Sequence, residues 1–227
     1  MSGFEVVCDW LGRQIVSGEL PSNSAVSVDA AAAATGVART VVREASRVIE
    51  GLGLIVPRQR VGLVVQPASS WALLDPRVIR WRLEVGDERQ ATRELAELRL
   101  AVEPLAASLA TYRRTDEQAR ELMEIAEAMS IEAPLEELIR IDQEFHHRLV
   151  EAAGNRLLVL AAAPIAEALR DHITRGPGRT PVAHELELHV LLATAVSDGD
   201  TEAAAELASR IIAGPGAGSG ADRTLCP

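Results

Sequence analysis

The sequence contains no lysine, and all 23 of its basic side chains are arginines. Only 3% of the residues are aromatic although 48% are hydrophobic, so alanine and aliphatic side chains must supply the interior. An interior rich in alanine and leucine favours helices over strands. We therefore expect a mainly α-helical protein, and 227 residues suffice for one large domain or two small ones.

Cysteine is nearly absent, and long apolar runs are missing altogether. The two cysteines, Cys8 and Cys226, lie near opposite ends of the chain and lack the spacing of metal ligands. Reduced thiols in a cytoplasmic protein are the simplest interpretation. No apolar run has the length of a membrane span, and the early acidic residues Glu5 and Asp9 argue against a signal peptide. We expect a cytoplasmic protein with no membrane partner.

The formal net charge of −10 argues against indiscriminate binding to nucleic acids. The charge is unevenly distributed, because residues 1–66 hold six arginines and six acids, whereas residues 67–227 hold 17 arginines and 27 acids. Within the neutral part, residues 39–60 carry five arginines and two acids. A locally basic segment in an acidic protein suits a sequence-specific DNA-binding protein better than one that coats DNA.

That basic segment begins with a helical pattern that carries arginines on one face. Arg39, Arg43 and Arg47 are spaced four residues apart, and the apolar residues between them face the other way. Gly36 precedes the pattern, and Gly51 and Gly53 end it. The arrangement is typical of a helix that enters the DNA major groove. Arginines on an ordinary solvated helix face are the alternative interpretation.

The segments before and after the basic helix predict two further helices and a β-hairpin. Residues 4–16 predict a first helix, and Ser27 can cap a short second helix over residues 30–34. Two β-prone runs within residues 54–65, joined by a turn that carries Arg58 and Arg60, predict a hairpin after the basic helix. Residues 1–66 are therefore predicted to form a winged helix-turn-helix.

The remainder of the chain is helical in pattern. Residues 67–74 read as a linker, after which Asp75 can cap a helix that has Pro76 at its first position. Short breaks divide residues 75–212 into six to seven helices, which predicts an antiparallel all-α bundle. Residues 213–227 are rich in glycine and are expected to be a flexible tail.

Residues 11–66 resemble the winged helix-turn-helix of the GntR family of transcription regulators. The resemblance is carried, in order and spacing, by Ile15, Gly18, Gly36, Val37, Arg39, Thr40, Val42, Arg43, Glu44, Ala45, Leu52, Gly62 and Val65. It implies that DNA is contacted by Arg39, Thr40, Arg43 and Arg47 and, from the wing, by Arg60 and Gly62. Three positions depart from the family pattern: Ala38 replaces serine, Val41 replaces proline and Ser46 replaces leucine.

Residues 75–212 resemble the helical ligand-sensing domain, called FCD, of the FadR subfamily. The resemblance rests on Glu97-Leu98-Arg99 with Glu103, on the segment from Asp142 to His146 with Gly154-Asn155, and on His189 with Gly199-Asp200. From the spacing of Asp142 and His146 alone, the simplest interpretation is a pair on the helix surface. The resemblance instead implies a divalent metal such as Zn, Ni or Mn on Asp142, His146 and His189. The fourth ligand would fall at Ile211, which cannot bind metal, although His147 or His184 could substitute.

Arg99 has two interpretations. Its spacing from Glu103 fits a helix-surface ion pair, whereas the resemblance implies that Arg99 grips the carboxylate of an effector. With a metal nearby, this implies a small organic or sugar acid, bound by Arg99, Asp142, His146 and His189.

These features together predict a ligand-responsive transcription regulator that is not an enzyme. We expect a repressor that binds a palindromic operator as a homodimer, because one winged helix reads few base pairs. The alternatives are a helical metalloenzyme, or a metal-binding sensor whose DNA-reading domain is degenerate, as Ala38 and Val41 suggest.

Overall fold

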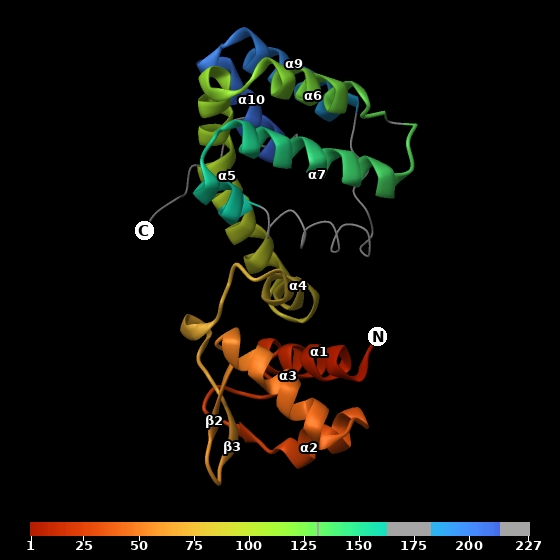
Figure 1. Ribbon diagram of the computed structural model, residues 1–227, viewed down its shortest axis with the longest axis vertical. Coiled ribbons are helices and arrows are strands. Elements are labelled where there is room, and N and C mark those ends of the chain that lie inside the picture. Colours follow the sequence, from red (N-terminus) through yellow and green to blue (C-terminus); the bar gives the residue numbers. More distant parts are fainter. Residues whose placement is uncertain (131, 163–182, 214–227) are drawn as a thin grey trace. The chain divides into compact units, whose positions relative to one another are not determined.

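The computed structural model describes residues 1–130, 132–162 and 183–213 of the chain (Figure 1). The chain folds into two compact units, Met1–Thr92 and Arg93–Pro227. Each unit has its own hydrophobic core and is described separately. The predicted flexible tail, apart from Ala213 at the end of the last helix, lies outside the described residues, as does Cys226.

Three helices form most of the first unit: α1 (Gly3–Val16), α2 (Val28–Thr35) and α3 (Arg39–Gly51). Serine hydroxyls cap the first two, because Ser2 accepts a hydrogen bond from the amide of Glu5 and Ser27 accepts one from that of Ala30. Gly36 ends α2 with a φ of 68°, a left-handed conformation that favours glycine. The helices predicted from the sequence are confirmed, and α2 is longer at both ends than expected.

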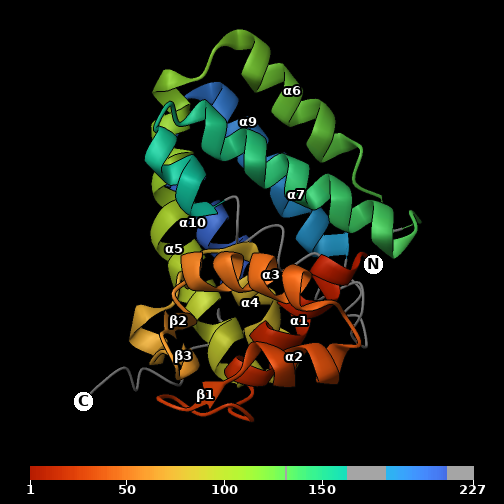
Figure 2. The same cartoon turned by 60° about the horizontal axis from the view of Figure 1, so that its bottom comes forward.

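A three-stranded antiparallel sheet completes the winged helix-turn-helix (Figure 2). The predicted hairpin is formed by β2 (Ile55–Arg58) and β3 (Gly62–Val65), with Ile55 opposite Val65. A third strand, β1 (Ala25–Val26), was not predicted and pairs with the other edge of β3. A strand of two residues is too short to carry an alternating pattern, so only its pairing partner defines it.

The next helix, α4 (Pro76–Val85), belongs to the first unit. Asp75 caps it by accepting a hydrogen bond from the amide of Arg77, as predicted. Trp81 is fully buried in the core of the first unit, and its indole N–H donates to Asp9 of α1 at 2.8 Å. The division at residues 92 and 93 therefore differs from the linker predicted at 67–74, which contains a short 3-10 helix, η1 (Ala68–Ser70).

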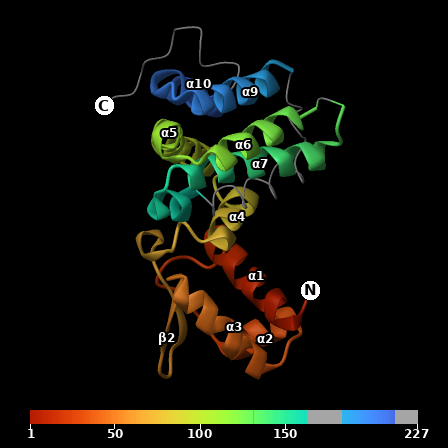
Figure 3. The same cartoon turned by 45° about the horizontal axis from the view of Figure 1, so that its top comes forward.

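The second unit is an all-helical bundle. Its described helices are α5 (Glu88–Arg113), which begins in the first unit, α6 (Asp116–Glu127), α7 (Leu135–Ala152), α9 (Ala183–Asp198) and α10 (Thr201–Ala213) (Figure 3). Helix α6 packs against both α7 and α9, and α9 packs against α10. Buried alanines and leucines dominate the core, as the composition predicted. With α4 included, the described part contains six of the helices expected after residue 75.

The predicted fold class is therefore confirmed. A winged helix-turn-helix with a small sheet is followed by a helical bundle. None of the helices in the described part of the chain is both long enough and apolar enough to span a membrane.

Candidate DNA-reading surface and candidate metal centre

Helix α3 has a buried apolar face and, opposite it, an exposed face that carries arginines. Val42, Ala45 and Ile49 are completely buried in the core of the first unit. The predicted DNA contacts lie on the opposite, exposed face: Arg39, Thr40, Arg43 and Arg47. The core packing thus holds the helix by its apolar face, and three guanidinium groups remain exposed for the bidentate contacts that arginine makes with guanine.

The three departures from the family pattern have local structural consequences. Ala38 is the N-cap residue of α3 and provides no side-chain hydrogen bond there. Ser46 is buried, but its hydroxyl donates to the carbonyl oxygen of Val42 at 2.7 Å, so that it costs little to bury. Val41 is half-buried and stays within the helix. The recognition helix therefore forms without its usual serine cap.

The structure adds a contact that the sequence did not indicate. The guanidinium group of Arg39 forms an ion pair with the carboxylate of Asp29, which lies in the first turn of α2. Both side chains are more than half exposed, so the pair lies on the surface. Arg39 would have to leave Asp29, or share it, when it contacts DNA.

The wing residues have different roles in the structure. Arg60 is exposed between β2 and β3 and has a φ of 64°, which is uncommon for a residue with a side chain. Gly62 has a φ of 113°, and a Cβ atom there would lie 2.8 Å from the carbonyl oxygen of Val26. Gly62 therefore permits the close pairing of β3 with β1, a structural reason for glycine besides its predicted contact with DNA.

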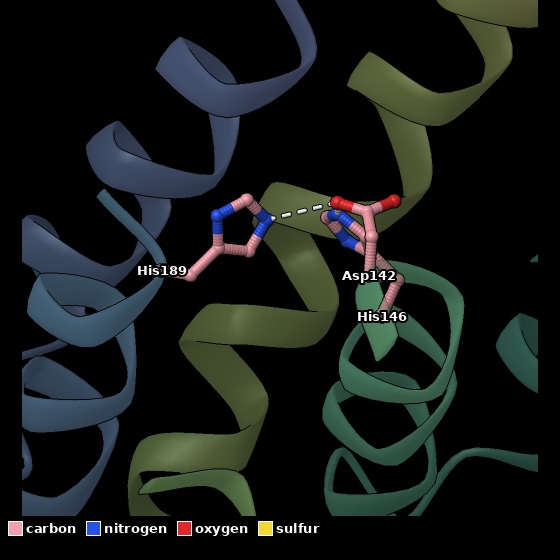
Figure 4. Close-up of side chains that lie close together, drawn as sticks. All are labelled: Asp142, His146 and His189. Carbon is pink, nitrogen blue, oxygen red and sulfur yellow. Dashed lines mark ion pairs between the residues drawn. The ribbon is translucent and has the colours of Figure 1, made fainter. Parts of the chain in front are cut away.

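In the second unit, the three predicted metal ligands lie together (Figure 4). Asp142 and His146 are one turn apart on α7, and His189 comes from α9. Their ligand atoms all lie within 4.8 Å of one another. Two nitrogen ligands and one oxygen ligand suit Zn²⁺ and related divalent ions.

The surroundings of these side chains also suit a metal. Nε2 of His189 lies 3.2 Å from Oδ1 of Asp142, whereas Nε2 of His146 lies 3.7 Å from the same oxygen. Both ring nitrogens of His146 are buried without a hydrogen-bond partner among the described residues, and Nε2 is the one that faces Asp142. A buried ring nitrogen left without a partner is costly, and a metal ion bound between the three side chains would satisfy it. The residues present therefore fit the metal that the resemblance implies.

Packing holds the two imidazole rings in place. Phe145 is completely buried and contacts both rings edge to face, with centroid distances of 5.7 Å to His146 and 5.1 Å to His189. Both histidines are themselves buried. Rings fixed in this way need little rearrangement to bind an ion.

Ile211 and His147, which were considered for the fourth ligand, do not join this cluster. Ile211 is half-buried and packs against the core of the second unit. His147 is 45% exposed in its side chain and pairs with Glu151 on its own helix. The side chain of His184 lies outside the described residues. The described cluster thus provides three protein ligands.

Behind the cluster lies a buried pair on α5. Nε of Arg99 donates to Glu103 at 2.6 Å and its Nη2 donates at 3.3 Å, with side-chain exposures of 22% for Arg99 and 5% for Glu103. The ion pair that the spacing predicted is formed, but in the interior and not on the helix surface. Glu103 also contacts His146, because its Oε2 lies 2.8 Å from Nδ1 of that residue. Glu103 was not among the predicted site residues, although its position four residues after Arg99 was a signal.

The charges of this cluster stabilise one another. Burial by itself would raise the pKa of Glu103, but the neighbouring His146 and Arg99 hold that pKa well below its usual range. Partial desolvation likewise opposes ionisation of Asp142, whose side chain is 43% exposed, yet His146, His189 and Arg99 lower its pKa. Burial alone would lower the pKa of His146, whereas Glu103 and Asp142 raise it. The neighbouring positive charges thus favour the ionised form of both carboxylates.

Comparison with known proteins identifies the second unit. The sequence profile of the FCD domain matches residues 94–214, which is more than half of the chain. The chain belongs to the FCD-domain regulators of the GntR family.

Relatives of this FCD-domain regulator are transcription regulators. The sequence is 28% identical over 183 residues to the HTH-type transcriptional regulator YieP of Escherichia coli (strain K12), covering 79% of each chain. It is 26% identical over 200 residues to a probable D-xylose utilization operon transcriptional repressor of Paenarthrobacter nicotinovorans, covering 87% of this chain and 80% of the relative. The expected function as a regulator with a ligand-sensing domain is confirmed.

A solved structure supports the fold over both units. The Streptococcus agalactiae GntR structure matches with a TM-score of 0.52 at 23% identity, covering 92% of this chain and 97% of that one. At this identity the match supports the arrangement of secondary structure, a winged helix-turn-helix followed by a helical domain.

Proposed function

We propose that this FCD-domain regulator is a homodimeric repressor that leaves its operator when a small carboxylate binds near a metal ion in the second unit. The exposed arginine face of α3 supports the DNA-binding half of the proposal. The convergence of Asp142, His146 and His189 beside Arg99 supports the sensing half, and it is the observation on which the proposal chiefly depends.

Different residues of the first unit would contact the bases and the phosphate backbone of the DNA. Arg39 and Arg43, near the start of α3, would contact base edges, and Thr40 would contact a phosphate or a thymine methyl group. Arg47, one turn further along, would position the backbone. On the wing, Arg60 would lie beside a phosphate or in the minor groove, and Gly62 would bring the wing backbone close to the DNA. Two copies are needed because palindromic operators match proteins with twofold symmetry.

In the second unit, Asp142, His146 and His189 would hold a divalent metal ion such as Zn²⁺, Ni²⁺ or Mn²⁺. Bound there, the ion supplies a positive centre with open coordination positions for water or an effector carboxylate. Arg99 supplies a second positive group, and its Nη1 makes no hydrogen bond within the described residues. A small acid with a carboxylate and neighbouring hydroxyls could contact both groups.

The chemistry of the site favours a small carboxylate as effector, and one relative is named for the utilization of a sugar. The Paenarthrobacter relative is named for D-xylose utilization, and sugar acids are among the small carboxylates that such a site would accept. Effector binding would act by population shift, because it stabilises a dimer whose two recognition helices no longer match the spacing of the half-sites.

Gel-shift measurements test the proposal. The purified protein is mixed with DNA from upstream of its own gene, with and without Zn²⁺, and then with a panel of sugar acids and hydroxy acids. We expect a specific shift that one class of acid reverses. A protein that binds no DNA with or without these ligands would contradict the proposed repressor and would favour a sensor with a degenerate reader domain.

Arginine variants test the assignment of the DNA-reading face. Arg43→Ala removes one exposed guanidinium group and is expected to lower operator affinity about 5- to 150-fold, because a good arginine–guanine pair is worth roughly 1–3 kcal/mol. Arg120→Ala is the matched control, since Arg120 is also an exposed arginine on a helix but lies in the second unit. Circular dichroism should show unchanged helix content in both. Equal affinity of the two variants would refute the assignment.

A further inference from the structure

We infer that Glu103 is a positioning residue of the metal centre, which fixes the proton of His146 on Nδ1 so that Nε2 is presented to the metal. The inference rests on the proposed metal centre and adds to it a residue that does not touch the ion. It assigns the pair Arg99–Glu103 to the sensing site as a support for His146.

The two ring nitrogens of His146 face different carboxylates. A neutral imidazole carries its proton on one nitrogen and can bind metal only through the other. Nδ1 lies at ion-pair distance, 2.8 Å, from Oε2 of Glu103, without the angle of a hydrogen bond, while Nε2 lies on the side of Asp142, with 3.7 Å between Nε2 and Oδ1. A carboxylate beside Nδ1 can only accept a hydrogen bond, so it favours the form with the proton on Nδ1.

Arg99 and the surrounding packing hold Glu103 in place. Its side chain is 5% exposed, and Arg99 donates to both of its oxygens, to Oε1 from Nε and to Oε2 from Nη2. These two hydrogen bonds from Arg99 favour the ionised carboxylate and orient Oε2 toward His146. Glu103 is not among the three residues whose ligand atoms converge, so its carboxylate supports a ligand rather than being one. Histidine ligands of metals commonly donate their second N–H to such a carboxylate.

A purely structural role is the competing explanation, in which Glu103 only neutralises the buried Arg99. Loss of a structural counterion would change the stability of the second unit. It would not change which nitrogen of His146 carries the proton. The experiment therefore needs a measurement of the tautomer in addition to a measurement of metal affinity.

The test compares full-length wild-type protein with Glu103→Gln and with Glu97→Gln as a matched control. Glu97 lies on the same helix and faces Arg93 across the same spacing, but that pair is exposed and 3.9 Å apart. Zn²⁺ affinity is measured by competition with a chromogenic chelator. The tautomer of His146 is read from long-range ¹H–¹⁵N correlations in metal-free, histidine-labelled protein at alkaline pH. The signals of His146 are assigned by their loss in His146→Gln.

We expect His146 to carry its proton on Nδ1 in the wild type and in Glu97→Gln, and to lose this preference in Glu103→Gln. Zn²⁺ affinity should fall about 10- to 100-fold in Glu103→Gln, the usual cost of losing such a supporting carboxylate. Glu103→Asp, which keeps the charge, should restore part of the affinity. It also provides a measurement if Glu103→Gln does not fold.

The outcomes separate the inference from the proposal on which it rests. A proton on Nε2 of His146 in the wild type, or an unchanged tautomer and affinity in Glu103→Gln, would overturn the role of Glu103. A wild type that binds no Zn²⁺ would refute the metal centre for this ion, while the tautomer would still decide whether Glu103 positions His146.

Discussion

The indole ring of Trp81 occupies the space that a side chain at Gly12 would need. A Cβ atom at Gly12 would lie 2.4 Å from three carbons of that ring, far inside van der Waals contact. Helix α4 therefore packs closely on α1, and the contact is extended by hydrogen bonds from Trp81 and Arg80 to Asp9. This contact explains why α4 is part of the first unit.

Gly12→Ala tests the close packing directly. The added methyl group must displace the Trp81 ring, which we expect to destabilise the first unit by about 1–3 kcal/mol. The measurement is thermal unfolding followed by tryptophan fluorescence. Gly51→Ala is the control, because a Cβ at Gly51 meets nothing within 4 Å and alanine favours the helix. Gly12→Ala with the stability of wild type would contradict the packing.

The missing cap of the recognition helix gives a second prediction. Ala38→Ser restores a hydroxyl at the N-cap of α3, where the backbone is already extended, and should raise stability by about 1 kcal/mol. Ser27→Ala removes the working cap of α2 and should lower stability by a similar amount. Chemical denaturation of both variants measures the two effects. A change of the same sign in both would show that capping is not the cause.

The ion pair between Asp29 and Arg39 gives a third prediction. Asp29→Asn removes a negative charge beside the proposed DNA-reading face and releases Arg39, so DNA should bind up to about fivefold more tightly. Thermal stability should change little, because an exposed ion pair is worth about 0–1 kcal/mol. Glu117→Gln is the control, since it disrupts a similarly exposed pair with Arg120 in the second unit. Weaker DNA binding by Asp29→Asn would show that Asp29 assists Arg39.

Metal addition and removal give a fourth prediction. Zn²⁺ at 100 times its dissociation constant should stabilise the second unit by about 2.7 kcal/mol, and a chelator should reverse the effect. Asp142→Asn should abolish this stabilisation, because it replaces the carboxylate that lies near both histidines. His147→Gln, which changes an exposed histidine outside the cluster, should keep it. Stabilisation by Zn²⁺ that persists in Asp142→Asn would place the metal elsewhere.

The sequence predicted most of the first unit because its signals are local. Helix caps act within one helical turn, as Ser27 and Asp75 do, and so does the helix break at Gly36. The four-residue spacing of the arginines on α3 likewise acts within one or two turns. The short strand β1 and the grouping of α4 with the first unit had no such local signal. Each depends on a partner distant in sequence: β3 for the strand and Gly12 for Trp81.

The candidate metal centre shows the same division. The spacing of Asp142 and His146 places them on one helix face, and the resemblance to the FCD domain added His189 and Arg99. Spacing alone left the pair of Arg99 and Glu103 on the helix surface, because an interval of four residues specifies neighbours but not burial. Packing of α5 against α7 brought Glu103 to within 2.8 Å of His146.

The sequence by itself determined the class of protein. Local patterns predicted the arginine face and the helical second unit, and the family resemblance predicted the three metal-ligand candidates. Only the tertiary structure decided which carboxylate supports His146, which acid faces Arg39 and which unit α4 joins. The physical reason is that helix periodicity specifies which side chains share a face of one helix. Contacts between helices depend on how their faces pack together.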